Sequence, residues 1–168
     1  MGAAPEDDVP VGVARRLAGY EISADPDRQD LGVIHGFLSG CDWARGISRE
    51  LVEQAVRNSL CVGAYRNGAQ VGFARAVTDR ATFAYFADVF VLPPHRRRGL
   101  ASALVATLMS HPDLRQVRRL LLSTRAAHGL YARLGFVPLS NPADFMTIHR
   151  VAAGCGGREP PSGPPDSP

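Results

Sequence analysis

The stretch VLPPHRRRGLASALV, residues 91–105, joins a strand-like run to the start of a helical pattern. Two prolines separate the patterns, and three consecutive arginines, residues 96–98, come directly before Gly99. The first turn of a helix has unpaired N–H groups with partial positive charge, which suit a phosphate. Gly99 lacks a Cβ that would block close approach, and small side chains at residues 101–103 keep the amides accessible. The stretch therefore predicts an anion-binding loop at the start of a helix.

Helical and strand-like patterns alternate on both sides of this loop. Before it we expect a short strand at residues 20–24, a helix at 27–38 and a second helix that starts after an N-cap at Ser48. An antiparallel meander of three strands is expected next, at 60–65, 70–78 and 82–91. Asn67-Gly68 is the expected hairpin turn, because a type I′ turn needs positive φ at both central residues. After the loop we expect a helix at residues 99–110, a strand at 119–123 and a short helix at 126–134. Two closing strands are expected at 136–139 and 145–151. This order predicts an α/β (α+β-like) domain with a mixed, mainly antiparallel sheet of about six to seven strands flanked by helices.

Composition indicates one folded domain between two loose ends. The chain has 168 residues, of which 45% are hydrophobic, and this is enough for one domain with its own core. Residues 1–18 are expected to form a flexible leader and residues 19–153 the domain. Residues 154–168 are rich in Gly and Pro and have no large apolar side chain, so we expect a disordered tail.

Charge and cysteine content narrow the choice of compartment and partner. The formal net charge of +3 is too weak to indicate nucleic-acid binding by itself. Cys41, Cys61 and Cys155 are an odd number without a CxxC pair, which favours free thiols in a reducing cytosol. No apolar run approaches the length of a membrane span, and the N-terminus lacks an apolar signal core. We expect a cytoplasmic protein that contacts neither membrane nor nucleic acid and has no metal site.

Two motifs resemble the signatures of the GCN5-related N-acetyltransferases, the GNAT family. The spacing Arg96-x-x-Gly99-x-Ala101 matches the family's Gln/Arg-x-x-Gly-x-Gly/Ala signature, and the preceding VFVLPPH resembles its central strand and loop. The later run HGLYARLGFVPL, residues 128–139, resembles the second signature, in which Leu-Tyr is followed shortly by Gly-Phe. The resemblance covers roughly residues 20–151 by element order. It implies the GNAT fold and an acetyltransferase that uses acetyl-CoA.

The resemblance also implies where acetyl-CoA, the co-substrate, would bind. In the family, amides of the signature loop hold the pyrophosphate; here these positions are Arg96, Arg97, Arg98, Gly99, Leu100 and Ala101, with Ser102 alongside. The strand before the loop splays from its neighbour, and the pantetheine arm lies along its edge, here Val89, Phe90 and Val91. Many members have a cofactor-contacting Asn where this chain has Thr124, which can still donate a hydrogen bond.

Tyr131 matches the family tyrosine that protonates the departing CoA thiolate. A phenol suits this role because it keeps its proton at neutral pH and can donate it over a short distance. The alternative is that Tyr131 is an amphipathic core residue. Some members place a catalytic Glu near the start of the preceding strand, but this chain has Arg119 there, so that base is absent.

Asp88, on the central strand, is the candidate to replace the missing base. It would take the proton of the amine directly or through water, or it would contact the substrate in another way. The alternative is a strand-end carboxylate satisfied by backbone or by an arginine. Alternation along the strand puts Asp88 and Phe90 on one face, and Val89 and Val91 on the other.

The acceptor site in the family is usually built from the N-terminal helices and their connecting loop. Here that loop is SGCDWARGIS, residues 39–48, which contains the single tryptophan, Trp43. An aromatic ring with flanking charges suits an amine, although packing of Trp43 under the loop explains it equally well. His128 lies one helical turn before Tyr131 and is a second candidate for substrate contact, with helix capping as its alternative.

Three functions compete at this point. The first is an N-acetyltransferase that transfers acetyl from acetyl-CoA to a primary amine of a small molecule or peptide by direct attack. The second is a catalytically idle acyl-CoA-binding module; the intact Tyr131 argues against it and the missing Glu argues for it. The third is a nucleic-acid binder, against which stand the low net charge and the lack of a basic–aromatic platform. Homodimers are common among similar proteins, so a homodimer is a further expectation.

Overall fold

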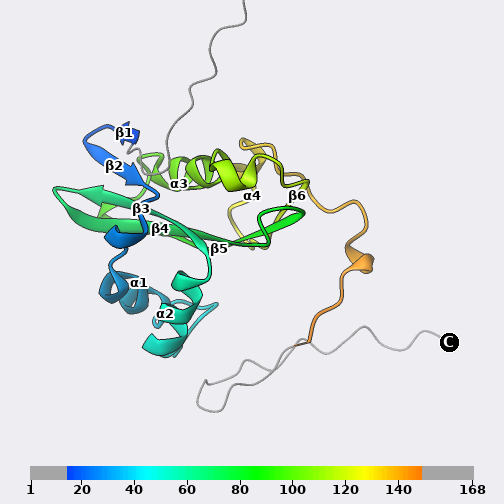
Figure 1. Ribbon diagram of the computed structural model, residues 1–168, viewed down its shortest axis with the longest axis horizontal. Coiled ribbons are helices and arrows are strands. Elements are labelled where there is room, and N and C mark those ends of the chain that lie inside the picture. Colours follow the sequence, from blue (N-terminus) through cyan, green and yellow to red (C-terminus); the bar gives the residue numbers. More distant parts are fainter. Residues whose placement is uncertain (1–14, 149–168) are drawn as a thin grey trace, which may run out of the picture.

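The computed structural model describes residues 15–148, which form a twisted sheet with helices on both faces (Figure 1). The six strands follow one another in sequence order across the sheet, and β5 and β6 are the one parallel pair among them. The strands are β1 (Arg15–Leu17), β2 (Tyr20–Ser23), β3 (Leu60–Arg66), β4 (Ala69–Thr78), β5 (Phe83–Val91) and β6 (Arg119–Leu122). The helices are α1 (Leu31–Leu38), α2 (Arg49–Arg57), α3 (Leu100–Met109) and α4 (His128–Ala132). The predicted fold class, a mixed and mainly antiparallel sheet flanked by helices, is confirmed.

Each face of the sheet has its own apolar core. Helix α3 packs on one face, where Leu100, Leu104 and Leu108 are almost fully buried against the strands. Helices α1 and α2 cover the other face, where Ile34 and Val52 lie in a second cluster. Figure 1 shows α3 on the opposite side of the sheet from α1 and α2. The sheet is therefore buried on both faces, as expected for strands that read as nearly continuous apolar runs.

Local capping signals in the sequence set several element boundaries. Ser48 is the N-cap of α2, and its hydroxyl accepts a hydrogen bond from the Leu51 amide at 3.3 Å. Asn67 and Gly68 have φ values of +50° and +82°, which confirms the predicted turn. The helix expected over residues 27–38 begins later, at Leu31, because the Asp30 carboxylate caps it there.

The N-terminal boundary of the folded part differs from the expected one. The sequence suggested a flexible leader up to residue 18, whereas residues 15–17 form β1, paired antiparallel with β2. Ala18 and Gly19, with φ of +46° and +82°, make the tight turn between the two strands. Strand β1 is too short and too polar to give a periodic signal, so its pairing depends on β2. Residues 1–14 and the expected tail at 154–168 lie outside the described residues.

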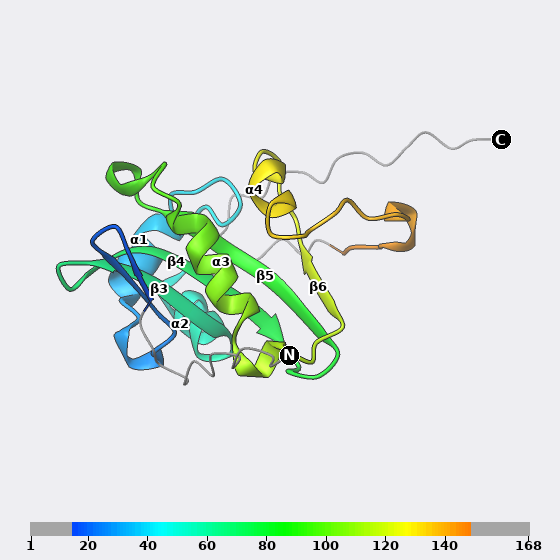
Figure 2. The same cartoon turned by 90° about the horizontal axis from the view of Figure 1, so that it is seen from above.

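The C-terminal strands expected from the sequence do not form within the described chain. Residues 136–139 contain no strand, and neither do residues 145–148; residues 149–151 lie outside the described part. Gly135, with φ of +91°, turns the chain after α4, and the segment that follows projects away from the sheet (Figure 2). A strand forms by hydrogen bonding to a neighbouring strand, and no described strand pairs with this segment.

Among residues 15–148, no helix combines the length and the apolar character that crossing a bilayer requires.

Candidate active site

The first turn of α3 presents backbone amides without a side-chain cap. Gly99 is the N-cap with φ of +78°, and no side chain accepts from the amides that follow it in the described chain. The hydrogen-bond ladder of the helix begins where the Ala103 amide donates to the Gly99 carbonyl at 3.0 Å. The amides of residues 100–102 precede that ladder and point out of the helix end. These amides lie at the positive end of the helix dipole, which suits binding of an anion, the role predicted from the sequence.

The loop before α3 is held by contacts to the strands beneath it. Arg96 donates from Nε to the Val91 carbonyl at 2.9 Å, and His95 bonds Tyr20 through its ring Nδ1 at 2.9 Å. Arg97 has a left-handed φ of +58°, so two left-handed residues, Arg97 and Gly99, bend the loop in succession. Such bends turn successive amides toward one point. Arg97 and Arg98 are exposed, so their charges stay available to a ligand.

Strand β5 extends beyond the end of its parallel neighbour β6. Their parallel pairing runs from Phe83 opposite Arg119 to Phe86 opposite Leu122. Strand β5 continues to Val91 and pairs with β4 on its other edge, so residues 87–91 have no β6 partner within the described chain. The β6 side of Val89, Phe90 and Val91 therefore has no strand partner within the described chain, because β6 ends at Leu122.

A β-bulge at Asp88 shapes the same part of β5. The register of β4 and β5 shifts between Phe73 and Arg75, and Asp88 has φ of +52°. The extra residue reverses the alternation, so that Phe86 and Phe90 lie in the cores on opposite faces. Val91 and Val89 pack on the α3 side, and Phe90 on the other. A bulge also turns backbone N–H groups out of the ladder at the opening between the strands.

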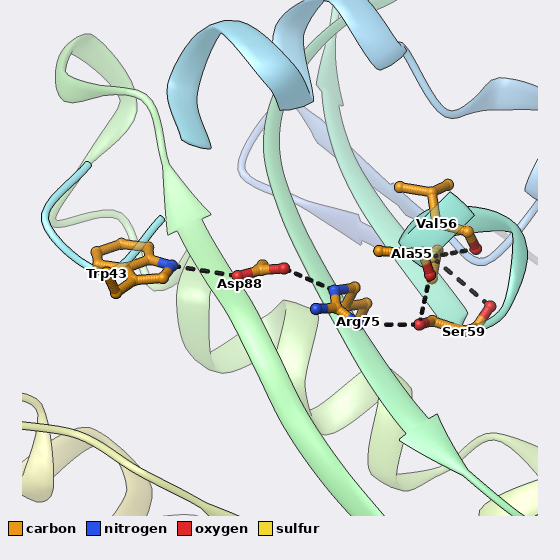
Figure 3. A network of polar contacts seen from close by, with 7 residues as sticks. Trp43, Ala55, Val56, Ser59, Arg75 and Asp88 are labelled. Atoms are coloured by element: carbon orange, nitrogen blue, oxygen red, sulfur yellow. Dashed lines mark hydrogen bonds and ion pairs between the residues drawn. The ribbon is translucent and has the colours of Figure 1, made fainter. Parts of the chain in front are cut away.

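Asp88 is the centre of a polar network on the α1–α2 side of the sheet (Figure 3). Its Oδ2 accepts from Arg75 Nε at 2.6 Å, and its Oδ1 accepts from Trp43 Nε1 at 3.1 Å. Arg75 also donates to the Ser59 hydroxyl at 3.1 Å, and that hydroxyl donates to the Ala55 carbonyl at 2.7 Å. The Arg75 and Asp88 side chains are only 17% and 13% exposed, so the ion pair is largely removed from water. The network ties β4, β5, the end of α2 and the loop after α1 together.

Trp43 lies on the surface and is not packed beneath its loop. It is 59% exposed, and its ring tilts against Phe37 with the centroids 6.2 Å apart. Phe37 stacks on Phe90 at 4.0 Å, so an aromatic row leads from the core to the indole. The neighbouring Asp42 and Arg45 form an exposed ion pair with each other. The exposed indole therefore covers the Asp88 carboxylate, which Arg75 satisfies, as the alternative interpretation of Asp88 expected.

Tyr131 approaches the opening from the other face of the sheet. It packs against the α3-side core, and its ring meets Phe136 edge-on at 5.8 Å, while Phe136 meets Phe86 at 5.7 Å. Phe86 is the last residue of β5 that pairs with β6, so Tyr131 stands where the two strands part. Burial raises the pKa of Tyr131 above its ordinary value of 10.0, so the phenol keeps its proton at neutral pH.

A groove runs along β6 beside Tyr131. It has a volume of about 1210 Å³ and is lined by Leu120, Leu122, Thr124, His128, Tyr131 and the segment that follows Gly135. Thr124 caps the turn before α4, because its hydroxyl accepts from the Ala127 amide at 3.1 Å. His128 is the first residue of α4 and is exposed. Thr124, His128 and Tyr131 thus line one groove, whereas Asp88 and Trp43 lie on the opposite face of the sheet.

Sequence reasoning missed Arg75 and Ser59. The signal for Arg75 is a charged residue inside the otherwise small and apolar strand GFARAV, residues 72–77, where burial demands a partner. Nothing in the sequence indicates Ser59, which lies just after α2. No group of three or more His, Cys, Asp or Glu side chains suited to a metal ion occurs in residues 15–148.

Comparison with known proteins identifies the family. A family model for the acetyltransferase (GNAT) domain matches residues 57–138. A Gibberella zeae protein named as a candidate acetyltransferase is 33% identical over 140 residues, which cover 69% of this chain and 78% of that protein. The chain belongs to the GNAT acetyltransferase family. These matches confirm the family membership that the sequence motifs predicted. Members of this family transfer acetyl groups and use acetyl-CoA.

Solved GNAT structures share the fold described above. A GNAT-family protein from Xanthomonas campestris is 47% identical, with a TM-score of 0.76 over 80% of this chain and 96% of that one. An acetyltransferase from Clostridium acetobutylicum, solved with acetyl-CoA, has a TM-score of 0.56 at 14% identity, over 77% of this chain and 94% of that one. The first likeness supports common family membership, and the second supports the GNAT fold alone.

Proposed function

We propose that this GNAT protein transfers acetyl from acetyl-CoA to a primary amine of a small molecule or peptide. The observation that carries the proposal is the uncapped first turn of α3, which follows the part of β5 that has no β6 partner in the described chain. A diphosphate bound at the helix end would place its attached chain along that part of β5. The site thus accommodates both parts of an elongated acyl-CoA.

In this proposal acetyl-CoA binds through the uncapped first turn of α3 and the free edge of β5. The pyrophosphate accepts hydrogen bonds from the amides at the start of α3, and nearby arginines screen its charge. The positions that take part are Arg96, Arg97, Arg98, Gly99, Leu100, Ala101 and Ser102. The pantetheine amides pair with the free edge of β5 at Val89, Phe90 and Val91. Thr124, which follows the end of β6 and lines the groove beside Tyr131, contacts the donor as well.

The proposed reaction is direct attack of the neutral amine on the thioester carbonyl. Attack forms a C–N bond and a tetrahedral intermediate, and a backbone N–H turned out at the β5 bulge donates to its oxyanion. Collapse breaks the C–S bond, and the leaving thiolate takes the proton of the Tyr131 hydroxyl. The nitrogen, which is cationic after attack, releases one proton to solvent and becomes the amide nitrogen. Tyr131 later regains a proton from solvent.

No described cysteine is placed to carry the acetyl group. Cys61 is buried, and burial raises its pKa to about 12, so it stays a protonated thiol. The pKa of Cys41 is also raised by burial, and its thiol donates to the Leu38 carbonyl. These positions favour direct transfer over a covalent acetyl-cysteine step.

The acceptor amine is assigned to the face that carries Trp43 and Asp88. A primary amine is a cation at neutral pH, and an indole face beside a carboxylate attracts such a group. Asp88 then takes the proton that the amine loses, directly or through water, before attack. His128, exposed on the groove side, is assigned to contact with the remainder of the acceptor or with the acyl donor.

The test is release of free CoA thiol when a panel of primary amines is added to protein and acetyl-CoA. Amines that are substrates raise thiol release above the rate of hydrolysis alone, and mass spectrometry finds the acetylated amine. A panel including polyamines, amino sugars, amino acids and peptides covers the accessible chemistry. Binding of acetyl-CoA without thiol release from any amine would instead favour the idle acyl-CoA-binding module.

A further inference from the structure

The loop that leads into α3 contacts the β1–β2 hairpin at two points. His95, near the start of the loop, bonds Tyr20 of β2 through its ring Nδ1 at 2.9 Å. Gly99, at the end of the loop, lies over Leu17 of β1, because a Cβ at Gly99 would be 3.7 Å from the Leu17 Cδ2. Between β5 and these contacts, Pro93–His95 form a single 3₁₀ turn, which is far too short to be stable without tertiary contacts. The position of the loop therefore depends on the hairpin.

Tyr20 is a buried side chain with its polar end against the loop. It is 3% exposed, and it belongs to the core on the α3 side of the sheet. Arg66, the last residue of β3, donates to the Tyr20 hydroxyl at 2.9 Å, and its guanidinium carbon lies 5.1 Å from the centroid of the Tyr20 ring. The His95 ring meets the Tyr20 ring edge-on, with the centroids 5.7 Å apart. Packing, the cation and the ring contact together fix where the hydroxyl lies.

The hydrogen bonds at the Tyr20 hydroxyl determine which nitrogen of His95 carries the proton. An arginine side chain donates and cannot accept, so Arg66 supplies the hydrogen of one bond. The hydroxyl's own hydrogen is then left for His95 Nδ1, since the opposite direction would leave a buried O–H without an acceptor among the described residues. Nδ1 accepts only when the ring is neutral with its proton on Nε2. Tyr20 therefore holds one tautomer and one orientation of His95.

We propose that Tyr20 is a positioning residue for the acyl donor: by fixing His95, it holds the loop in the bend that leads into the first turn of α3. The inference rests on the proposed function, because this helix end is the proposed site of the diphosphate. A loop that already has its bound shape loses less conformational freedom when the ligand arrives, and so binds it more tightly. Tyr20 acts through His95 and not on the reacting atoms, so its effect falls on donor binding and not on the chemical step.

The test is calorimetric titration of acetyl-CoA into Tyr20→Phe, which keeps the ring and removes the hydroxyl. The Kd, and the KM for acetyl-CoA with an amine from the panel, should rise about three- to tenfold, the effect of one hydrogen bond, with kcat unchanged. Tyr65→Phe is the matched control. Tyr65 is also 3% exposed, lies beneath the Arg28 guanidinium, and loses a hydroxyl bond, to the Arg28 carbonyl, that does not involve the loop. Tyr65→Phe should keep the wild-type Kd.

A second variant, His95→Ala, removes the other partner of the bond from a half-buried loop position. It should raise the Kd to a similar extent, and Tyr20→Phe/His95→Ala should bind no more weakly than His95→Ala alone, because both changes remove the same bond. Circular dichroism of all variants should match the wild type, which excludes unfolding as the cause. Without any ligand, nitrogen-15 NMR of the imidazole rings should show the His95 proton on Nε2 in the wild type and a mixture of tautomers in Tyr20→Phe.

The outcomes separate this inference from the proposed function. If the wild type binds acetyl-CoA and Tyr20→Phe binds it equally well, the positioning role is overturned and the proposed function stands. Additive losses in the double variant, or a wild-type His95 with its proton on Nδ1, would also overturn the positioning role alone. Absence of acetyl-CoA binding by the wild type would overturn the proposed function, and the positioning role with it.

Discussion

At the scale of single residues, Tyr131 has the environment that its proposed role requires. It is half-buried where β5 and β6 part, and burial raises its pKa above 10.0. The raised pKa keeps the acid form present throughout the neutral range. The sequence located Tyr131 by its motif, but its contact with Phe136 and its place at the opening needed the fold.

Replacing Tyr131 by Phe removes the proton donor and keeps the ring. We expect kcat to fall by about 10²–10⁴-fold, the usual contribution of a positioned general acid, with the Kd for acetyl-CoA unchanged. Tyr65→Phe, which removes a hydroxyl on β3 that donates to the Arg28 carbonyl, is the control and should retain kcat. Because the pKa of Tyr131 is raised, any alkaline loss of activity that Tyr131 causes should appear only above pH 10. An unchanged kcat in Tyr131→Phe would remove it as the acid.

The ion pair of Arg75 and Asp88 is the clearest residue-scale feature that the sequence did not disclose. Alternation suggested the face of Asp88, but the partner depends on the register of β4 against β5, which shifts at this bulge. Register is set by the whole sheet, so a reading of one strand does not give it.

Arg75→Met should destabilise the protein, because it leaves a largely buried carboxylate without its cation. We expect a loss of roughly 2–3 kcal/mol in the free energy of unfolding, below the value for fully buried pairs because both side chains keep some solvent contact. Urea denaturation measures it. In the double variant Arg75→Met/Asp88→Asn the loss should be smaller than the sum of the single losses. Additive losses would show that the pair is not coupled.

At the scale of elements, the sequence disclosed those boundaries that depend on local chemistry. The N-cap at Ser48, the Asn67-Gly68 turn and the helix after Gly99 are all fixed by neighbouring residues, and all were predicted. Strand β1 was not predicted, because its three residues form a strand only by pairing with β2. The apolar patterns at residues 136–139 and 145–151 predict strands, but such a pattern does not identify the strand with which each would pair.

The turn between β3 and β4 provides a matched pair of Gly→Ala substitutions. Gly68→Ala should lower the free energy of unfolding by about 1–2 kcal/mol, because its φ of +82° crowds a Cβ against the backbone. Gly36→Ala, in the middle of α1 with open space around the new Cβ, should raise stability by about 0.5–1 kcal/mol. Urea denaturation of both variants checks the signs. Equal effects would contradict the turn geometry.

At the scale of the whole molecule, the proposed acid and the proposed acceptor contacts lie on different faces of the sheet. In the proposal the acyl donor binds along the free edge of β5, with Tyr131 on the α3 side of the sheet and Trp43 and Asp88 on the α1–α2 side. The sequence predicted the fold class and the helix that begins after Gly99, since family motifs and local patterns indicate both; phosphate binding at that helix end stays a prediction. The sequence did not predict that the proposed acid and the proposed acceptor contacts lie on opposite faces.

Residues 154–168 are predicted to contribute nothing to the folded core. Deleting them should change the Tm by less than about 2 °C, because Gly- and Pro-rich sequence without large apolar side chains buries little surface. Thermal unfolding followed by circular dichroism checks this. A much larger drop in Tm would show that these residues pack on the domain.

The central claim is that the first turn of α3 binds acetyl-CoA, and Gly99→Glu addresses it. The side chain puts a negative charge where the pyrophosphate would lie, while a Cβ at this position meets Leu17 Cδ2 at an ordinary 3.7 Å. Gly68→Glu is the control, because it adds the same charge at a similar φ of +82°, far from α3 in sequence and with nothing within 4 Å of the new Cβ.

The most direct measurement is calorimetric titration of acetyl-CoA into the wild type and both variants. The account predicts saturable binding near one site per chain in the wild type and in Gly68→Glu, and none in Gly99→Glu with its circular dichroism preserved. Binding of equal affinity in Gly99→Glu, or no binding in the wild type, would contradict it.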